Sequence, residues 1–244
     1  MSYFGLIGFP LSHSFSQKIF QQQFGEAHQY DLLPCETISQ VESRLKNPHK
    51  YSGFNVTIPY KEQVINLLDE LSMEASEIKA VNTILVEKSG RKVGYNTDSN
   101  AFKITLLEWL PELPKSAIIL GGGGASKAVA YALRSLGVPF SVVERTPHIS
   151  KHLSYSQLNQ IGLGEFELIV NTTPCGMHPN VSETPPILLN QISANHKVYD
   201  LIYNPHTTAL MQSAADKKAA TLNGINMLKL QAKIAWNIWG LTNK

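Results

Sequence analysis

The chain has 244 residues, 43% of them hydrophobic and 16% charged, and a formal net charge of +2 at pH 7. This length can bury the core of one large domain or two small ones, while the small net charge and scattered basic residues argue against a nucleic-acid partner. No apolar run reaches the ~18 residues of a membrane span, so we expect no membrane partner. The first residues do not resemble a signal sequence, and the two cysteines, Cys35 and Cys175, lack the spacing of a zinc site. These features predict a protein of the reducing cytoplasm.

Strand and helix patterns alternate along the chain, which predicts an α/β fold with largely parallel sheets. In the first half, apolar periodicity predicts strands at residues 3–8, 55–58 and 81–86 and helices at 15–24, 61–71 and 98–109. Gly25 is placed to end the first of these helices, and Asp98 to cap the last. The two prolines of segment 111–114 end that last helix and make the segment a candidate domain boundary.

The second half is typical of a doubly wound nucleotide-binding sheet, of which we recognise about half. The pattern predicts strands at 117–120, 140–144, 168–171 and 198–201 and helices at 125–136 and 227–241. In such a sheet the ligand binds at the carboxyl ends of the strands.

A glycine-rich turn joins the first strand and helix of this second half. Its sequence, Gly121-Gly122-Gly123-Gly124-Ala125-Ser126, supplies the first two glycines of the dinucleotide fingerprint, with Ser126 where the third usually stands. Glycines allow a tight turn and the close approach of a pyrophosphate, whose charge the first amides of the helix would meet. A plain glycine turn is the alternative, but the position between strand and helix favours dinucleotide binding.

The residues at the end of the next strand give conflicting signals about the cofactor. Glu144 stands where an acidic residue binds the ribose 2′-hydroxyl of NAD, whereas Arg145 and Thr146 follow directly, and an arginine there suits the 2′-phosphate of NADP. Further positive charge is available from Lys127, His148 and Lys151. A solvated Glu144–Arg145 ion pair is the alternative without a binding role.

Lys61 and Asp98 are the candidate catalytic residues. Pro59 should end the strand before Lys61, and a lysine at the start of a helix opposes the helix dipole, which suggests a cation kept for chemistry. Paired with Asp98 it would form a proton-transfer couple. A solvated lysine and a simple helix cap are the alternatives. Ser14 and Ser16 are in the same way either helix caps or ligands of a carboxylate at free helix amides.

Several motifs in order along the chain resemble those of the shikimate dehydrogenase family. They are Gly8-Phe9-Pro10, Ser12-His13-Ser14-Phe15-Ser16, residues 55–61, 80–83, 96–98 and 121–125, Arg145-Thr146, residues 171–174 with 176–177, residues 200–205, and Gly224 with Met227 and Gln231. The resemblance covers nearly the whole chain, and several motifs in order are far less probable by chance than one glycine turn.

The resemblance implies reversible NADP-dependent reduction of 3-dehydroshikimate to shikimate, a step towards chorismate and the aromatic amino acids. It implies a substrate domain at 1–98 and 225–244, to which the C-terminal helix returns, and a Rossmann-like NADP-binding domain at 99–224. No metal is implied, and the protein is expected to be a monomer or a homodimer. Lys61 and Asp98 would be catalytic. The substrate would be bound by these two residues together with Ser14, Ser16, Asn55, Thr57, Asn82, Tyr203 and Gln231. The cofactor would be bound by Gly121, Gly122, Gly123, Gly124, Ala125, Glu144, Arg145, Thr146, Thr172, Thr173, Pro174, Gly224 and Met227.

Three positions depart from the family pattern. Glu144 stands where NADP-using members often carry asparagine, so NAD is an alternative cofactor; if NADP is used, we expect the Glu144 side chain to turn outward or contact only the edge of the cofactor. Gln17 replaces a frequent proline and Ser99 a frequent glycine, without touching the expected chemistry. Two other functions stay open: a quinate/shikimate dehydrogenase of broader specificity that uses NAD, and a non-catalytic sensor that binds shikimate-like ligands.

Overall fold

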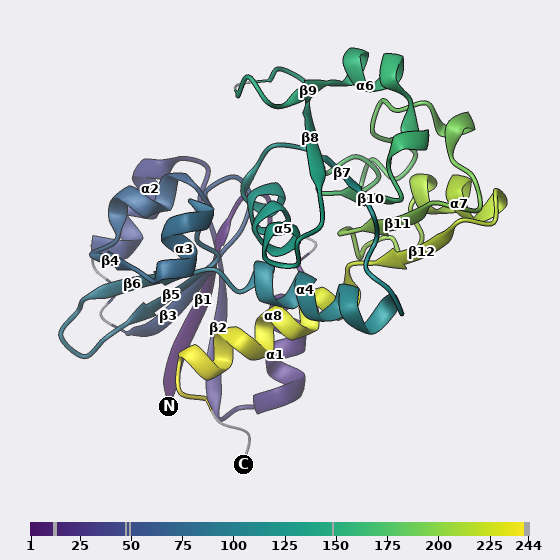
Figure 1. Ribbon diagram of the computed structural model, residues 1–244. Helices are drawn as coiled ribbons and strands as arrows, with labels where there is room; N and C mark the ends of the chain where they lie inside the picture. Colours follow the sequence, from purple (N-terminus) through teal and green to yellow (C-terminus); the bar gives the residue numbers. More distant parts are fainter. Residues whose placement is uncertain (12–13, 47, 49, 148, 242–244) are drawn as a thin grey trace. The chain divides into compact units, whose positions relative to one another are not determined.

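The computed structural model describes residues 1–11, 14–46, 48, 50–147 and 149–241 (Figure 1). Ser12, His13 and His148, named above, lie outside the described residues. The chain forms two compact units: unit 1 comprises Met1–Ala101 and Lys229–Lys244, and unit 2 comprises Phe102–Leu228. Among the described residues, no helix is long and apolar enough to cross a membrane.

Unit 1 contains a sheet in which parallel pairings outnumber antiparallel ones, as expected, with one antiparallel strand. Within the described residues its strand order is β2-β1-β3-β5-β6-β4. The strands are β1 (Ser2–Gly8), β2 (His28–Pro34), β3 (Tyr51–Val56), β4 (Glu70–Leu71), β5 (Thr83–Val86) and β6 (Lys92–Tyr95). Strand β5 is antiparallel to both β3 and β6. The reason is local, because β5 and β6 are joined by a short hairpin through Gly90, and so short a connection can join only antiparallel strands.

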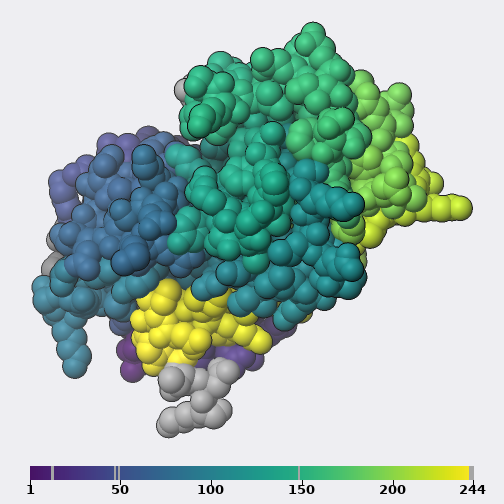
Figure 2. All heavy atoms as spheres, in the orientation of Figure 1, coloured from purple at the N-terminus to yellow at the C-terminus, as the bar shows by residue number. Residues whose placement is uncertain are grey.

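The two faces of this sheet bury different helices. The helices of unit 1 are α1 (Ser16–Phe24), α2 (Ile38–Lys46), α3 (Met73–Ile78) and most of α8 (Ile225–Ile238). Successive side chains of a strand point to opposite faces, so Phe4 and Leu6 join a cluster with α1 and α8, while Ile7 joins the cluster of α2 and α3. The outward side of α8 lies on the surface, in yellow in Figure 2.

An aromatic cluster attaches the C-terminal helix to this sheet, as the sequence predicted. The Trp239 ring stacks on Phe4 with centroids 4.5 Å apart, and its Nε1 donates a hydrogen bond of 2.9 Å to the Ile84 carbonyl. Gly53 leaves room for this indole, because a Cβ at that position would collide with it. Trp236 meets Phe20 of α1 edge to face, so α1 and α8 lie side by side (Figure 1).

Unit 2 contains a parallel sheet in the described part of the chain, with strand order β12-β11-β10-β7-β8-β9. Its strands are β7 (Ala117–Leu120), β8 (Phe140–Glu144), β9 (Leu153–Ser154), β10 (Leu168–Asn171), β11 (Lys197–Asp200) and β12 (Ala220–Asn223). Its helices are α4 (Asp98–Trp109, from Phe102 onward), α5 (Gly124–Ser135), α6 (Tyr155–Ile161) and α7 (Ala209–Asp216). Counted in chain order, this is the 3-2-1-4-5-6 arrangement of a complete dinucleotide-binding sheet, and not half of one.

The division between the units lies within α4 and not at segment 111–114. Phe102 stacks on Tyr199 of β11 with ring centroids 5.1 Å apart, and the hydroxyls of Thr105 and Tyr199 are 2.6 Å apart. These contacts attach the helix to unit 2 from Phe102 onward. The prolines that follow it end the helix without dividing the fold. Which unit binds substrate and which binds cofactor stays a prediction.

Candidate active site

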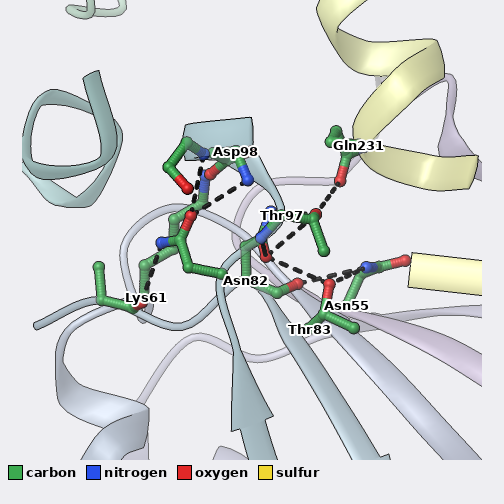
Figure 3. Close-up of polar contacts among 10 residues, drawn as sticks. Asn55, Lys61, Asn82, Thr83, Thr97, Asp98 and Gln231 are labelled. Atoms are coloured by element: carbon green, nitrogen blue, oxygen red, sulfur yellow. Dashed lines mark hydrogen bonds and ion pairs between the residues drawn. The ribbon is translucent and has the colours of Figure 1, made fainter. Parts of the chain in front are cut away.

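Lys61 and Asp98 are in direct contact in unit 1. The Lys61 Nζ lies 2.6 Å from Asp98 Oδ2, and the two side chains are only 16% and 8% exposed (Figure 3). Shielding from water strengthens the attraction between opposite charges. Lys61 is therefore shielded from water and paired, which contradicts the alternative interpretation of a solvated lysine.

The local structure around Lys61 differs from the predicted strand, proline and helix. Strand β3 ends at Val56, three residues before Pro59, and Ile58 is 53% exposed and does not continue the alternation into the core. A 3₁₀ helix, η1 (Gln63–Leu67), replaces the predicted α-helix, so Lys61 lies in a turn and the argument from the helix dipole does not apply. The Lys61 carbonyl accepts a 2.7 Å hydrogen bond from the Val81 amide, which fixes this turn beside the sheet.

Asp98 is the first residue of α4 and not its cap, which corrects the prediction. Asn96 Oδ1 accepts hydrogen bonds from the backbone amides of Asp98 and Ser99, at 3.1 and 3.2 Å. Because Asn96 satisfies these amides, the Asp98 carboxylate is directed to Lys61 instead.

A network of side-chain hydrogen bonds surrounds the pair. Asn82 and Thr97 exchange two bonds: Asn82 Nδ2 donates to Thr97 Oγ1 at 2.9 Å, and the Thr97 amide donates to Asn82 Oδ1 at 2.8 Å. Thr97 Oγ1 also donates to Gln231 Oε1 at 3.3 Å, which brings α8 to the site (Figure 3). Asn55 belongs to the same network, since its Nδ2 donates to Thr83 Oγ1 and to the Asn82 carbonyl.

Tyr30 is a member of this network that sequence reasoning missed. Its hydroxyl donates a 2.8 Å hydrogen bond to Asn55 Oδ1, and the ring is 2% exposed. This bond decides which side of the Asn55 amide carries the oxygen. No motif names Tyr30, because it lies on β2, which the sequence did not predict.

Ser14, Ser16 and Thr57 lie half-buried near the ends of β1 and β3 in unit 1. Ser16 begins α1, whose N-cap Phe15 makes no side-chain capping bond among the described residues. Ser14 Oγ accepts from the Ser16 amide at 3.3 Å, and the Thr57 amide donates to the Ile7 carbonyl at 2.9 Å. The two serines thus stand beside the amides at a helix start, where an anion is favoured.

The glycine turn of unit 2 fits a dinucleotide. Gly121 has φ +112°, which favours glycine, and a Cβ there would lie 2.7 Å from Thr172 Oγ1. Space around Gly123 is open, and α5 starts at Gly124 without a side-chain cap in the described part of the chain. The first amides of this 12-residue helix, together with the open space at Gly123, could hold a pyrophosphate. Ala125 follows within the first turn of α5.

Glu144 turns inward and not outward; contact with only the edge of the cofactor, the other arrangement expected if NADP is used, stays a prediction. Its carboxyl group lies against Gly122, so that a Cβ on this glycine would collide with it, and it is hydrogen-bonded to His152 Nδ1. Arg145 and Thr146 are exposed directly after β8. Sequence reasoning missed His152.

The remaining predicted cofactor residues follow β10 or lie at the start of α8, and Tyr203, predicted to bind substrate, follows β11. Thr172 Oγ1 donates to the Leu120 carbonyl at 2.7 Å and Thr173 Oγ1 to Asn171 Oδ1 at 2.7 Å, while Pro174 is exposed. Gly224 is required by space, because a Cβ would collide with the Leu201 carbonyl. Met227 is buried in α8 and Tyr203 is half-buried after β11, both in unit 2.

Asp200 is a buried carboxylate to which the sequence analysis gave no role. It accepts hydrogen bonds from Thr208 Oγ1 at 2.7 Å, the Ile202 amide at 3.0 Å and Asn171 Nδ2 at 3.0 Å. Burial raises the pKa of Asp200 to about 6, against the hydrogen bonds that lower it. The group connects the ends of β10 and β11 with the start of α7. Among the described residues, no three His, Cys, Asp or Glu side chains are grouped to hold a metal ion.

The chain is similar to known proteins along most of its length. Residues 6–84 match the family model "Shikimate dehydrogenase substrate binding domain". The NADP(+) shikimate dehydrogenase of Carboxydothermus hydrogenoformans is 37% identical over 96% of this chain and 90% of its own length.

Solved structures are similar over the whole chain. Shikimate dehydrogenase 1 of Peptoclostridium difficile is 34% identical, with a TM-score of 0.89 over 100% of this chain and 93% of that one. The enzyme of Thermus thermophilus, solved with NADP(H) and shikimate, is 29% identical with a TM-score of 0.85 over 100% and 95%. Quinate dehydrogenase of Corynebacterium glutamicum, solved with NAD, is 27% identical with a TM-score of 0.86 over 99% and 94%. The Lys61–Asp98 pair, the glycine turn and these similarities together show that the chain belongs to the shikimate dehydrogenase family.

Proposed function

We propose that this protein is a shikimate dehydrogenase that reversibly reduces 3-dehydroshikimate to shikimate with NADPH. The observation that carries the proposal is the shielded contact of Lys61 with Asp98 in a chain of this family. A cation held beside a carboxylate is what a carbonyl reduction requires, since the carbonyl oxygen gains negative charge as the bond is reduced.

Lys61 donates a proton to that oxygen or stabilises its charge, and Asp98 orients the Lys61 ammonium group through the 2.6 Å contact. When bound, NADPH supplies the hydride, while the protein supplies position and electrostatics. In the reverse direction Lys61, as the neutral amine, takes back the proton of the shikimate hydroxyl while Asp98 orients it.

The substrate is held by polar groups around this pair. Ser14 and Ser16 bind its carboxylate beside the first amides of α1, and Thr57, Asn82, Asp98 and Gln231 bind its ring oxygens. Asn55, whose amide already bonds to Tyr30 and Thr83, contributes a fixed polar surface. Tyr203 contacts the substrate where it meets the nicotinamide.

The cofactor is held by the glycine turn and by the loops after the neighbouring strands of unit 2. The residues that we assign to it are Gly121, Gly122, Gly123, Gly124, Ala125, Glu144, Arg145, Thr146, Thr172, Thr173, Pro174, Gly224 and Met227. Arg145 reads the 2′-phosphate of NADP.

A second candidate is a quinate/shikimate dehydrogenase of broader specificity that uses NAD. The inward position of Glu144 against Gly122 favours it, since a carboxylate there accepts hydrogen bonds from a free ribose 2′-hydroxyl. A non-catalytic sensor is disfavoured by the contact between Lys61 and Asp98, which a binding protein would not need.

One absorbance assay separates these functions. The purified protein is given shikimate or quinate with NADP⁺ or NAD⁺, and reduced nicotinamide is followed. Turnover fastest with shikimate and NADP⁺ supports the first proposal, and comparable turnover with quinate and NAD⁺ supports the second. Binding of shikimate without any turnover would leave only the sensor.

We also propose that the protein works in the cytoplasm, because Cys35 and Cys175, both within the described residues, are free thiols as a reducing compartment requires. A monomer or a homodimer remains our prediction for its assembly. Light scattering at assay concentration measures it.

A further inference from the structure

The contact between Glu144 and His152 results from the pairing of two strands. In the register of β8 and β9, Val143 lies beside Leu153 and Glu144 beside Ser154. His152, the residue just before β9, is therefore fixed beside the end of β8, where its Nδ1 meets Glu144 Oε1. The side chains of Glu144 and His152 are 13% and 19% exposed.

This pair differs from an ordinary surface ion pair. In Lys46–Glu42, for comparison, the side chains are 69% and 43% exposed. Glu144 also lies beside Arg145 in the sequence, yet its carboxyl group lies inward against Gly122 and not with that exposed cation. A partly shielded carboxylate held by a hydrogen bond has a defined orientation, which a solvated one lacks.

The position of the carboxylate indicates what it meets. Glu144 ends the second strand of a 3-2-1-4-5-6 sheet and lies beside the glycine turn after the first strand, which is where such sheets read the adenosine ribose. His152 engages Oε1, and Oε2 is among the atoms that a Cβ on Gly122 would strike. Oε2 is therefore the oxygen directed towards the turn.

We propose that His152 is a positioning residue for cofactor selectivity: it holds Glu144 so that Oε2 accepts a hydrogen bond from the ribose 2′-hydroxyl. This rests on the proposed function in so far as the ligand is a nicotinamide dinucleotide. In NADP a phosphate replaces that hydroxyl, and the fixed carboxylate repels it while Arg145 attracts it. The Glu144–His152 pair therefore makes the preference for NADP over NAD smaller, so that NAD can also bind.

Removal of the His152 contact frees Glu144 to rotate into solvent. Binding of NADH should then weaken, because its 2′-hydroxyl loses the acceptor, while binding of NADPH should hold or improve, because the repulsion is relieved. A purely structural role of His152 would change both affinities by the same factor. The ratio of the two dissociation constants thus distinguishes the two roles.

The test is binding of NADH and NADPH to the full chain without shikimate, followed by nicotinamide fluorescence. The variants are His152→Leu, His152→Gln, which keeps a donor, and Glu144→Gln, which keeps the shape; His206→Leu, an exposed histidine of unit 2, is the control. We expect His152→Leu and Glu144→Gln to weaken NADH binding roughly tenfold, as for loss of a hydrogen bond to a charged group, without weakening NADPH binding.

We further expect His152→Gln to stay within a few-fold of the parent in both affinities. The double variant His152→Leu with Glu144→Gln should match Glu144→Gln alone, because both changes disable the same acceptor. An unchanged NADH to NADPH ratio in Glu144→Gln, or equal losses for both cofactors in His152→Leu, would overturn the proposal.

These results are independent of the proposed reaction. Absence of any shikimate oxidation by the parent would refute the reaction, while the ratio of the two binding constants would still report on Glu144 and His152. If His152→Leu did not fold, His152→Ala would take its place, with the same expected loss of NADH binding and the same outcome that would overturn the proposal.

Discussion

The two candidate binding regions are built in different ways. In unit 1 the site consists of side chains that bond to one another: Lys61 to Asp98, Asn82 to Thr97, and Thr97 to Gln231. In unit 2 the glycine turn offers backbone amides and open space at Gly123, with Glu144 packed against Gly122 and Thr172 against Gly121. If the assignment of the two units is right, activity should depend on residue identity in unit 1, whereas dinucleotide binding in unit 2 should depend on backbone conformation and only its selectivity on side chains.

The two regions also treat a buried carboxylate differently. Asp98 is paired with a cation, whereas the donors that the structure gives for Asp200 are two side-chain groups and one amide, all neutral. Neutral donors offset burial less completely than a cation does, and the pKa of Asp200 rises to about 6. Asp200 is thus suited to hold loops in place, and Asp98 to hold a charge for chemistry.

The largest effect should come from the side-chain region. Lys61→Ala should lower turnover of shikimate about 10²–10⁴-fold, the range for a lost general acid, with a smaller change in substrate affinity. Initial rates at saturating shikimate measure the turnover. The melting temperature checks that the variant, in which Asp98 has lost its partner Lys61, is still folded. Lys18→Ala, an exposed lysine of α1, is the matched control. Turnover within a few-fold of the parent would remove Lys61 from the mechanism.

The next effect concerns the buried carboxylate of unit 2. Because its folded pKa is raised, from 3.8 to about 6, protonated Asp200 favours the folded state. This contribution is fully present below about pH 4 and is lost as the pH rises through 6. We expect the stability of the parent relative to Asp200→Asn to fall by up to about 3 kcal/mol across that window.

Urea unfolding of both proteins at several pH values from 4 to 7.5 measures the difference. Asp216→Asn, at an exposed position of α7, is the control: its free energy of unfolding should vary with pH in the same way as that of the parent. A constant difference between parent and Asp200→Asn over this range would mean that Asp200 is already ionised in the folded protein at low pH.

Arg145→Ala tests selectivity in the backbone-built region. Loss of a charge-assisted hydrogen bond to the 2′-phosphate should raise KM for NADP roughly tenfold or more and leave KM for NAD nearly unchanged. Steady-state kinetics with both cofactors measure it, with Arg91→Ala in unit 1 as control. Equal effects on both cofactors would show that Arg145 does not read the phosphate.

The smallest effect should be that of single hydroxyls in unit 1. Ser14→Ala and Ser16→Ala should each weaken shikimate binding by about 0.5–3 kcal/mol if they hold the substrate carboxylate, with little change in melting temperature. Ser72 is the matched control, because its Oγ caps α3 by accepting from the Ala75 amide at 3.1 Å. Ser72→Ala should lower stability by about 1 kcal/mol and leave shikimate affinity unchanged. Loss of stability without loss of affinity in the Ser14 and Ser16 variants would assign them a capping role instead.

Local sequence patterns predicted the strongly apolar elements well and the short or polar ones poorly. Strands β7 and β8 have their predicted bounds, because each contains at least two consecutive buried apolar residues. Strand β9 has two residues and β12 is only partly buried, so neither shows an apolar run. These two strands were therefore not predicted, and the sequence pattern indicated only half of a doubly wound sheet. Helix η1 was predicted as α-helical because spacing of apolar residues alone does not separate the two helix types.

The candidate catalytic pair could be named from the sequence, but its geometry could not. Lys61 and Asp98 stand in motifs with a recognisable order, whereas the capping of α4 by Asn96 depends on where that helix starts. Tyr30 and His152 were missed since their roles exist only through contacts with Asn55 and Glu144.

The sequence by itself determined the α/β class, the glycine turn, the candidate pair and the family resemblance, because these are properties of residues close together in the chain. The tertiary structure decided the contact of Thr97 with Gln231, which lies 134 residues further along the chain. It also decided that Trp239 packs against Gly53 and that Glu144 is directed inward against Gly122. Such features depend on which strands are neighbours and on where space is left between packed side chains. A local stretch of sequence determines neither the order of the strands nor the space between packed side chains.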